Sequence, residues 1–170
     1  MKKILLIVLC VVLALSMVAC GSSDTPEATE NKGNTSKDSK YVFVVEAKNN
    51  YTVKIDADMA DVLAALGEPL SYFEAASCAF DGLDKTYTYA GFRVLTRPEG
   101  SKDYVNSIQL VDDSVQTPEG IYIGSTADDV LSKYGNVTKT DTLISYTDGN
   151  TAINFILKDG VVISIEYLVA

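Results

Sequence analysis

Few side chains in this sequence can carry enzyme chemistry. The chain has 23 acidic and 14 basic residues, three cysteines and no histidine. Without histidine, neither a Ser-His-Asp nor a Cys-His arrangement can form, and the imidazole ligands of most zinc sites are missing. The carboxylates and one cysteine beyond the N-terminal region, Cys78, are the candidates that are left.

Cys78 lies in the segment Ser77-Cys78-Ala79-Phe80, which we predict to be a strand. A nucleophilic thiol needs a neighbouring base or cation to ionise, and the nearest cation in the sequence is Lys85. The alternation of a strand places Cys78 on the same face as Phe80. We therefore expect Cys78 to be a buried, unreactive side chain.

Three aspartates, Asp56, Asp58 and Asp61, have a spacing that is similar to the start of a calcium-binding loop. Such a loop needs glycine at its sixth position and glutamate at its twelfth, where this chain has Asp61 and Gly67. Capping of a following helix explains these aspartates better. Weak calcium binding by the acidic loops is left as an alternative.

The charge of the chain excludes some partners. Removal of Lys2 and Lys3 with an N-terminal signal would leave 12 basic and 23 acidic residues, a net charge of −11. This charge argues against binding to nucleic acid or to anionic lipid. No phosphate-binding glycine loop and no G-x-S-x-G motif occurs, so the sequence predicts no cofactor, no metal ion and no catalytic residues.

The N-terminal region is typical of a secreted protein. Two lysines precede an apolar run from Ile4 to Val18, in which Ser16 is the only polar residue. This is the pattern of a secretory signal peptide, and the run is shorter than the about 20 residues of a spanning helix.

The end of this run, Met17-Val18-Ala19-Cys20, resembles a bacterial lipobox, in which cleavage occurs before a lipid-bearing cysteine. The resemblance implies a lipoprotein signal peptide over residues 1–19 and a lipid on Cys20 that inserts into the membrane. Residues 20–40 are polar and are predicted to be a disordered tether. We expect a domain of residues 41–170 held at the outer face of the cell membrane, with plain secretion as the alternative.

Residues 41–170 show patterns of both strands and helices. Tyr41–Ala47 and Tyr51–Ile55 predict a hairpin that turns at Asn49-Asn50. Apolar residues at helical spacing predict two short helices, each closed by a glycine: Met59, Val62, Leu63, Leu66 and Gly67 in the first, and Ala127, Val130, Leu131, Tyr134 and Gly135 in the second. Ser125 is the predicted N-cap of the second helix.

The two helices correspond at an offset of 68 residues, and each precedes a run of predicted strands. The last strands share a pattern, Val105-x-Ser107-Ile108-x-Leu110 against Val162-x-Ser164-Ile165-x-Tyr167. We interpret this as an internal duplication of about 51–112 and 121–169. The sequence therefore predicts an α+β fold of two tandem units, each a short helix packed on an antiparallel β-meander.

The helix motif G-S-T-x-x-D-V-L-x-x-Y-G resembles the repeat of β-lactamase-inhibitor-protein-like domains and of the SmpA/OmlA outer-membrane-assembly lipoproteins. The residues that carry the resemblance are Gly124, Ser125, Asp129, Val130, Leu131, Tyr134 and Gly135, echoed by Asp61, Val62, Leu63 and Gly67. The segments "SCAFDGLDKTYTY" and "TPEGIYIGST" are also similar to uncharacterised lipoproteins of Gram-positive bacteria. The resemblance implies an envelope protein and assigns no functional residue.

Two pairs of side chains mark a candidate partner surface. Tyr87 and Tyr89 share one face of a predicted strand, and Arg93 and Arg97 share a face of the next. Tyrosine and arginine are enriched at binding hot spots, although the two tyrosines would equally suit the core. We expect a non-enzymatic domain that binds a protein or an envelope ligand. A carboxylate-based extracellular hydrolase and an envelope assembly or chaperone component are the alternatives.

Overall fold

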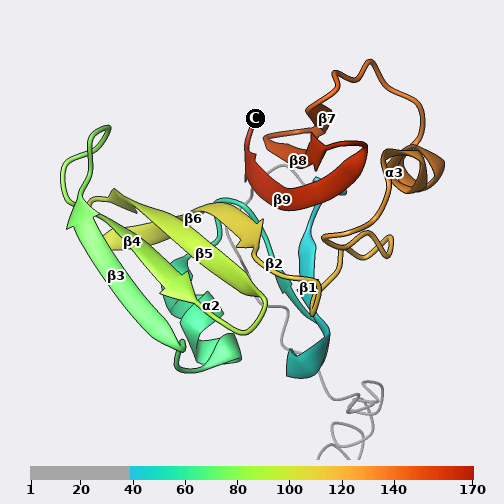
Figure 1. The fold of residues 1–170 in the computed structure, drawn as a ribbon. Helices are drawn as coiled ribbons and strands as arrows, with labels where there is room; N and C mark the ends of the chain where they lie inside the picture. The colour runs from blue at the N-terminus through green and yellow to red at the C-terminus, as the bar shows by residue number, and fades with distance from the viewer. Residues whose placement is uncertain (1–38) are drawn as a thin grey trace, which may run out of the picture. The chain divides into compact units, whose positions relative to one another are not determined.

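The computed structural model describes residues 39–170, so the predicted signal peptide, Cys20 and nearly all of the tether lie outside the described residues. The elements, shown in Figure 1, are β1 (Phe43–Val45), η1 (Glu46–Lys48), β2 (Tyr51–Val53), α2 (Met59–Leu66), β3 (Ser71–Ala76), β4 (Leu83–Thr88), β5 (Phe92–Glu99), β6 (Lys102–Leu110), α3 (Ala127–Tyr134), β7 (Leu143–Asp148), β8 (Thr151–Lys158) and β9 (Val161–Val169). Neither α-helix in this part of the chain is long and apolar enough to span a membrane.

Strands β3 to β9 form one antiparallel sheet with the order β3-β4-β5-β6-β9-β8-β7. The prediction of an α+β fold made of two tandem helix-on-meander units is therefore wrong, because the described part is mostly β and both meanders belong to the same sheet. The reason is the pairing of β6 with β9, in which Ile108 lies opposite Tyr167. This pairing satisfies the backbone groups that each meander alone would leave free at its edge.

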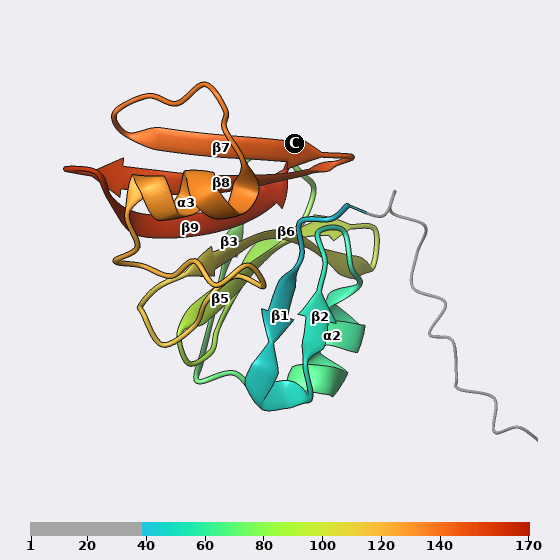
Figure 2. The same ribbon diagram turned by 90° about the vertical axis from the view of Figure 1, so that its right-hand side faces the viewer.

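One face of the sheet carries the core. Ile108, Ile165 and Tyr167 are buried on this face, whereas Gln109 and Glu166 alternate with them on the other face. The hairpin of β1 and β2 contributes Phe43, whose ring centroid lies 4.9 Å from that of Phe92. Figure 2 shows α3 lying across β8 and β9, and α2 packs against β2 and β6. The opposite face of the sheet is open to solvent over much of its area.

The predicted hairpin and helices are present, but the strands of the hairpin are shorter than predicted, and η1 occupies the end of the first predicted strand. Asn49 and Asn50 have positive φ in the turn between β1 and β2. Gly67 and Gly135 close the two helices by donating their N–H groups to Leu63 and Leu131. The cap of α3 is Thr126 rather than Ser125, because Thr126 and Asp129 form a reciprocal capping box.

The entries of the two helices have matching backbone hydrogen bonds. In the first half, Asp56 donates to Val105 and Val105 donates to Ala57. In the second half, 57 to 68 residues later, Gly124 donates to Val162 and Val162 donates to Ser125. The hydroxyl of Tyr89 donates a hydrogen bond to the carbonyl of Gly67, and the hydroxyl of Tyr146 donates one to the carbonyl of Gly135. The internal duplication stays a prediction that these contacts support, with both copies sharing one sheet.

We expect the free energy of unfolding of the Asp58→Asn variant to depend less on pH than that of the wild type. Asp58 caps α2, and the hydrogen bonds from Lys102 and from the backbone of Ala60 lower the pKa of its carboxyl. A lowered pKa stabilises the folded state above the ordinary aspartate pKa of about 3.9, and this contribution disappears as pH falls through the folded value. Denaturant unfolding between pH 2 and 7 should show the two proteins converging at low pH. A difference that grows on acidification would contradict the assignment.

Candidate binding surface

The structure does not bring the four predicted surface residues together. Tyr87 and Tyr89 are only 7% and 8% exposed and lie on the core face of the sheet. The hydroxyl of Tyr89 is used internally, because it donates to the carbonyl of Gly67. The two tyrosines therefore pack the core and present no surface to a partner.

The two arginines lie on the open face and differ from each other. Arg97 is half-buried, with its Nη1 atom 2.8 Å from Oδ1 of Asp56 and its guanidinium over the ring of Tyr104. Asn150 donates a hydrogen bond to the same carboxylate of Asp56. Arg97 is thus tied into a structural network. Arg93 is exposed, and within residues 39–170 it makes no ion pair.

Arg93 belongs to a polar row that crosses the open face of the sheet. Strand register places one residue of the row on each strand, and all of them are polar: Ser71, Thr88, Arg93, Gln109, Glu166, Asn154 and Ser145. Two hydrogen bonds join neighbouring residues of the row. Gln109 Nε2 donates to Glu166 Oε1 at 3.0 Å, and Ser145 Oγ donates to Asn154 Oδ1 at 2.6 Å. The row offers hydrogen-bonding groups to a polar partner lying on this face.

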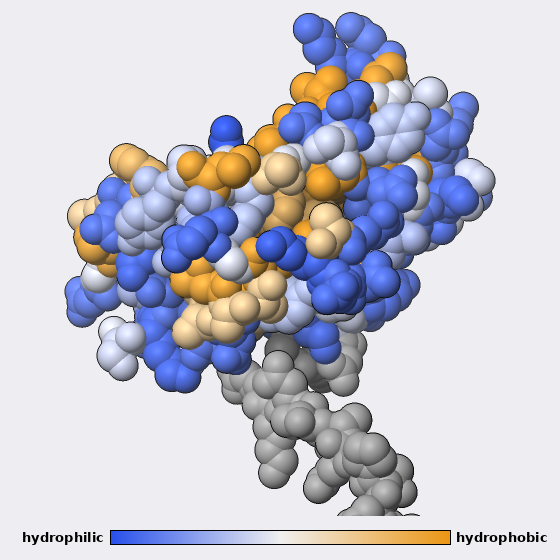
Figure 3. Space-filling view, turned by 90° about the horizontal axis from the view of Figure 1, so that it is seen from below, coloured by the Kyte–Doolittle hydropathy of each residue, from blue (hydrophilic) through white to orange (hydrophobic). Residues whose placement is uncertain are grey.

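Strand β3 forms one edge of the sheet and is exposed along all of its six residues. Phe73 is 66% exposed, and Leu70 just before the strand is 75% exposed. Tyr72, Phe80 and Leu83 add further exposed apolar surface at this end of the sheet. Figure 3 shows apolar side chains reaching the surface at the end of the molecule where β3 lies. Natural edge strands commonly carry lysine or proline, and β3 has neither.

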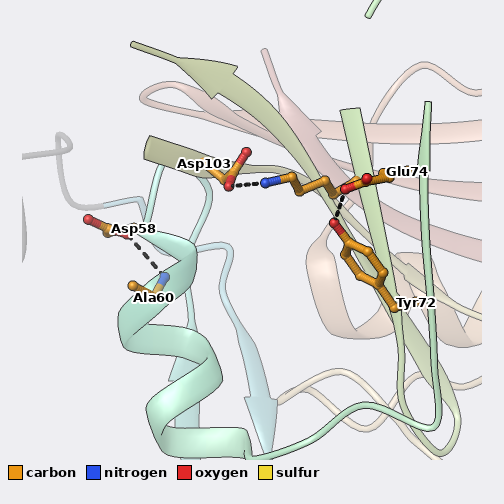
Figure 4. A network of polar contacts seen from close by, with 6 residues as sticks. Asp58, Ala60, Tyr72, Glu74 and Asp103 are labelled. Carbon is orange, nitrogen blue, oxygen red and sulfur yellow. Dashed lines mark hydrogen bonds and ion pairs between the residues drawn. The ribbon is translucent and has the colours of Figure 1, made fainter. Parts of the chain in front are cut away.

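Polar contacts lie near β3 and β4 on the side of the sheet that faces α2 (Figure 4). Tyr72 donates a hydrogen bond to Glu74, and this bond raises the pKa of the Tyr72 hydroxyl. Lys85 on β4 pairs with Asp103 on β6 at 2.7 Å, and the same contact raises the pKa of Lys85. Glu74 lies opposite Lys85 in the register of the two strands. The apolar edge is a defined part of the sheet because all six residues of β3 pair with β4.

The structure places Cys78 differently from the prediction. The segment Ser77–Phe80 is part of the turn between β3 and β4, not a strand, and Cys78 is exposed. The strand of this region, β3, lies earlier in the chain, at Ser71–Ala76. The adjacent aromatic residues Tyr72 and Phe73, which favour strands, were the available signal for β3.

Within residues 39–170, no three acidic or cysteine side chains are grouped so that they could hold a metal ion. Two of the three aspartates with the calcium-like spacing are used in other ways. Asp56 pairs with Arg97, and Asp58 caps α2 and pairs with Lys102 at 2.6 Å.

No protein-family model and no curated protein matches this chain. Among solved structures, it is similar to an extracellular protein containing an SCP domain from Bacillus anthracis, with 16% identity and a TM-score of 0.41. That match covers 89% of this chain and 50% of the other, so the chain spans about half the length of that protein. A DUF4309 family protein from Bacillus subtilis shows 17% identity and a TM-score of 0.40, over 66% of this chain and 78% of the other.

Proposed function

We propose that residues 39–170 form a non-enzymatic binding domain that pairs with an extended segment of a partner protein along β3. The observation that carries the proposal is the exposure of every residue of this edge strand. An unpaired edge offers a row of backbone N–H and C=O groups, and an added strand satisfies them while its side chains give specificity.

The side chains of β3 define the chemistry of the segment that fits. Phe73 and Ala75 lie on the open face of the sheet, whereas Tyr72 and Glu74 lie on the other face. A partner strand with an apolar residue opposite Phe73 would bury surface that is now 66% exposed. A hydrogen-bond donor on its other face would meet the carboxylate of Glu74.

The polar row supports the same surface. It begins at Ser71 on β3 and continues over the neighbouring strands to Arg93 and Gln109. A partner that adds a strand to β3 can extend over this face and meet the exposed guanidinium of Arg93. Arg93 is thus the one residue of the predicted surface that belongs to the proposed site.

The proposal also includes the location of the domain. A lipid on Cys20 would hold it at the outer face of the cell membrane, with residues 20–40 as the tether. The support is the apolar run Ile4–Val18 and the lipobox-like Val18-Ala19-Cys20. Partners are then proteins of the cell envelope, and neither nucleic acid nor a cofactor is part of the proposal.

Photocrosslinking in cells that produce the full chain tests the proposed edge. A photoreactive amino acid at Ala75 on β3 is expected to give a discrete protein adduct, and the same amino acid at Thr147 is not. Thr147 is the matched control because it is exposed on the other edge strand, β7, on the same face of the sheet.

A second change makes the result specific for strand addition. Adding Phe73→Lys should lower the yield of the adduct from position 75 at least tenfold, because a lysine on an edge strand opposes pairing with another strand. Adding Thr147→Lys should leave it unchanged. Equal adducts from both edges, or an adduct that survives Phe73→Lys, would contradict the proposal.

A further inference from the structure

We infer a second site, separate from β3, in a pocket beside the β1 hairpin that is built to bind a small organic ammonium ion with an apolar body. The pocket has a volume of about 430 Å³, within the usual range for small-molecule sites. Three segments form it: the end of β1 with η1, the turn between β4 and β5, and the loop that follows β6. Figures 1 and 2 both show this loop beside β1.

The floor of the pocket is apolar. Val45 and Phe92 belong to the buried core and line the pocket, together with Val44 and the half-buried Val115. Phe92 is fixed there by ring contacts with Phe43 and Tyr89 at centroid distances of 4.9 and 5.1 Å. An aromatic or aliphatic group of a ligand would lie on this floor and lose contact with water.

The rim of the pocket is acidic. Glu46 on η1 and Asp113 on the loop after β6 line the pocket, and no lysine or arginine does. Neither carboxylate forms an ion pair within residues 39–170. The uncharged polar lining residues Ser114, Gln116 and Tyr122 add hydrogen-bonding groups. A cation is therefore the charge that the rim favours, and an anionic ligand would meet repulsion.

The loop that forms one wall is held in a fixed conformation. Val111 donates to the carbonyl of Gly91 at 2.9 Å, and the backbone N–H of Ser114 donates to Asp112 at 2.9 Å. Gly91 packs so closely beneath the loop that an added Cβ atom would lie 2.6 Å from Ser114 Oγ. The wall is thus preorganised, which lowers the entropic cost of binding.

Titration of the full chain with three compounds of similar shape, followed by amide NMR shifts, tests the site. 2-Phenylethylamine, which is cationic at neutral pH, is expected to shift the amides of Val45, Phe92 and Val115 saturably. Neutral 2-phenylethanol should bind more weakly, and anionic 3-phenylpropanoate should bind at least tenfold more weakly than the amine. Equal affinity for all three compounds, or shifts centred on β3, would overturn the inference.

Charge-neutralising variants assign the effect to the rim. Glu46→Gln combined with Asp113→Asn should weaken binding of the amine about threefold to tenfold, as expected for ionic contacts of two exposed carboxylates. Asp141→Asn combined with Asp159→Asn changes the net charge equally at a separate hollow near α3 and should leave the affinity unchanged. If the two double variants weaken binding alike, the attraction is not local and the site is refuted. The two control aspartates lie away from β3, so this result is independent of strand addition.

Discussion

Replacing Phe155 by alanine is expected to lower the free energy of unfolding by about 3–5 kcal/mol. Phe155 is fully buried at the centre of β8, and its ring packs against Tyr134 of α3 at a centroid distance of 5.0 Å. Tyr146 of β7 meets the same ring at 6.3 Å. The truncation leaves a cavity where α3 joins the sheet. Urea unfolding followed by circular dichroism measures the loss.

Phe73→Ala is the matched control for this prediction. The same side chain is removed, but Phe73 is 66% exposed on β3, so the free energy of unfolding should change by less than about 0.5 kcal/mol. The two variants should also differ in function, because Phe73→Ala should weaken the proposed strand addition. If Phe73→Ala destabilised the protein as much as Phe155→Ala, β3 would be part of the core and the proposed edge site would be wrong.

Apart from β3, most elements of this fold follow from local patterns, whereas their assembly does not. The helical spacing of Met59, Val62 and Leu66 and the closing glycine Gly67 were sufficient to place α2. The two meanders were also visible, but nothing in their local sequence states which edges pair. Ile108 and Tyr167 have the same alternation whether their strands end two separate sheets or meet in one. The predicted fold class is therefore wrong at the pairing of β6 with β9, which joins the two meanders.

The candidate surface was predictable only in part for a similar reason. Alternation correctly places Tyr87 and Tyr89 together on one face, and Arg93 and Arg97 together on a face, but it does not show which face is covered. The hairpin of β1 and β2 and the helices cover the tyrosine side, which leaves Arg93 on the open face. The pocket beside β1 could not be predicted, because Glu46, Phe92 and Asp113 come together only through tertiary packing.

We expect Gly91→Ala to lower the free energy of unfolding by about 2–5 kcal/mol, from backbone strain and overpacking together. Gly91 has a φ of +81°, which side-chain-bearing residues rarely adopt. An added Cβ would also lie 2.6 Å from Ser114 Oγ and 2.7 Å from Val115 Cγ1. The loop after β6 must then move, so the amine site should be lost as well.

Gly100→Ala separates the two causes. Gly100 also has a positive φ, +63°, but no atom lies within 4 Å of the position of its added Cβ. This variant should lose only the strain, about 1–2 kcal/mol, and should bind 2-phenylethylamine as the wild type does. Equal losses of stability in the two variants, measured by urea unfolding, would mean that the loop yields freely to the new methyl group. The loop that forms the wall of the pocket would then be flexible, and preorganisation of this wall would no longer account for binding.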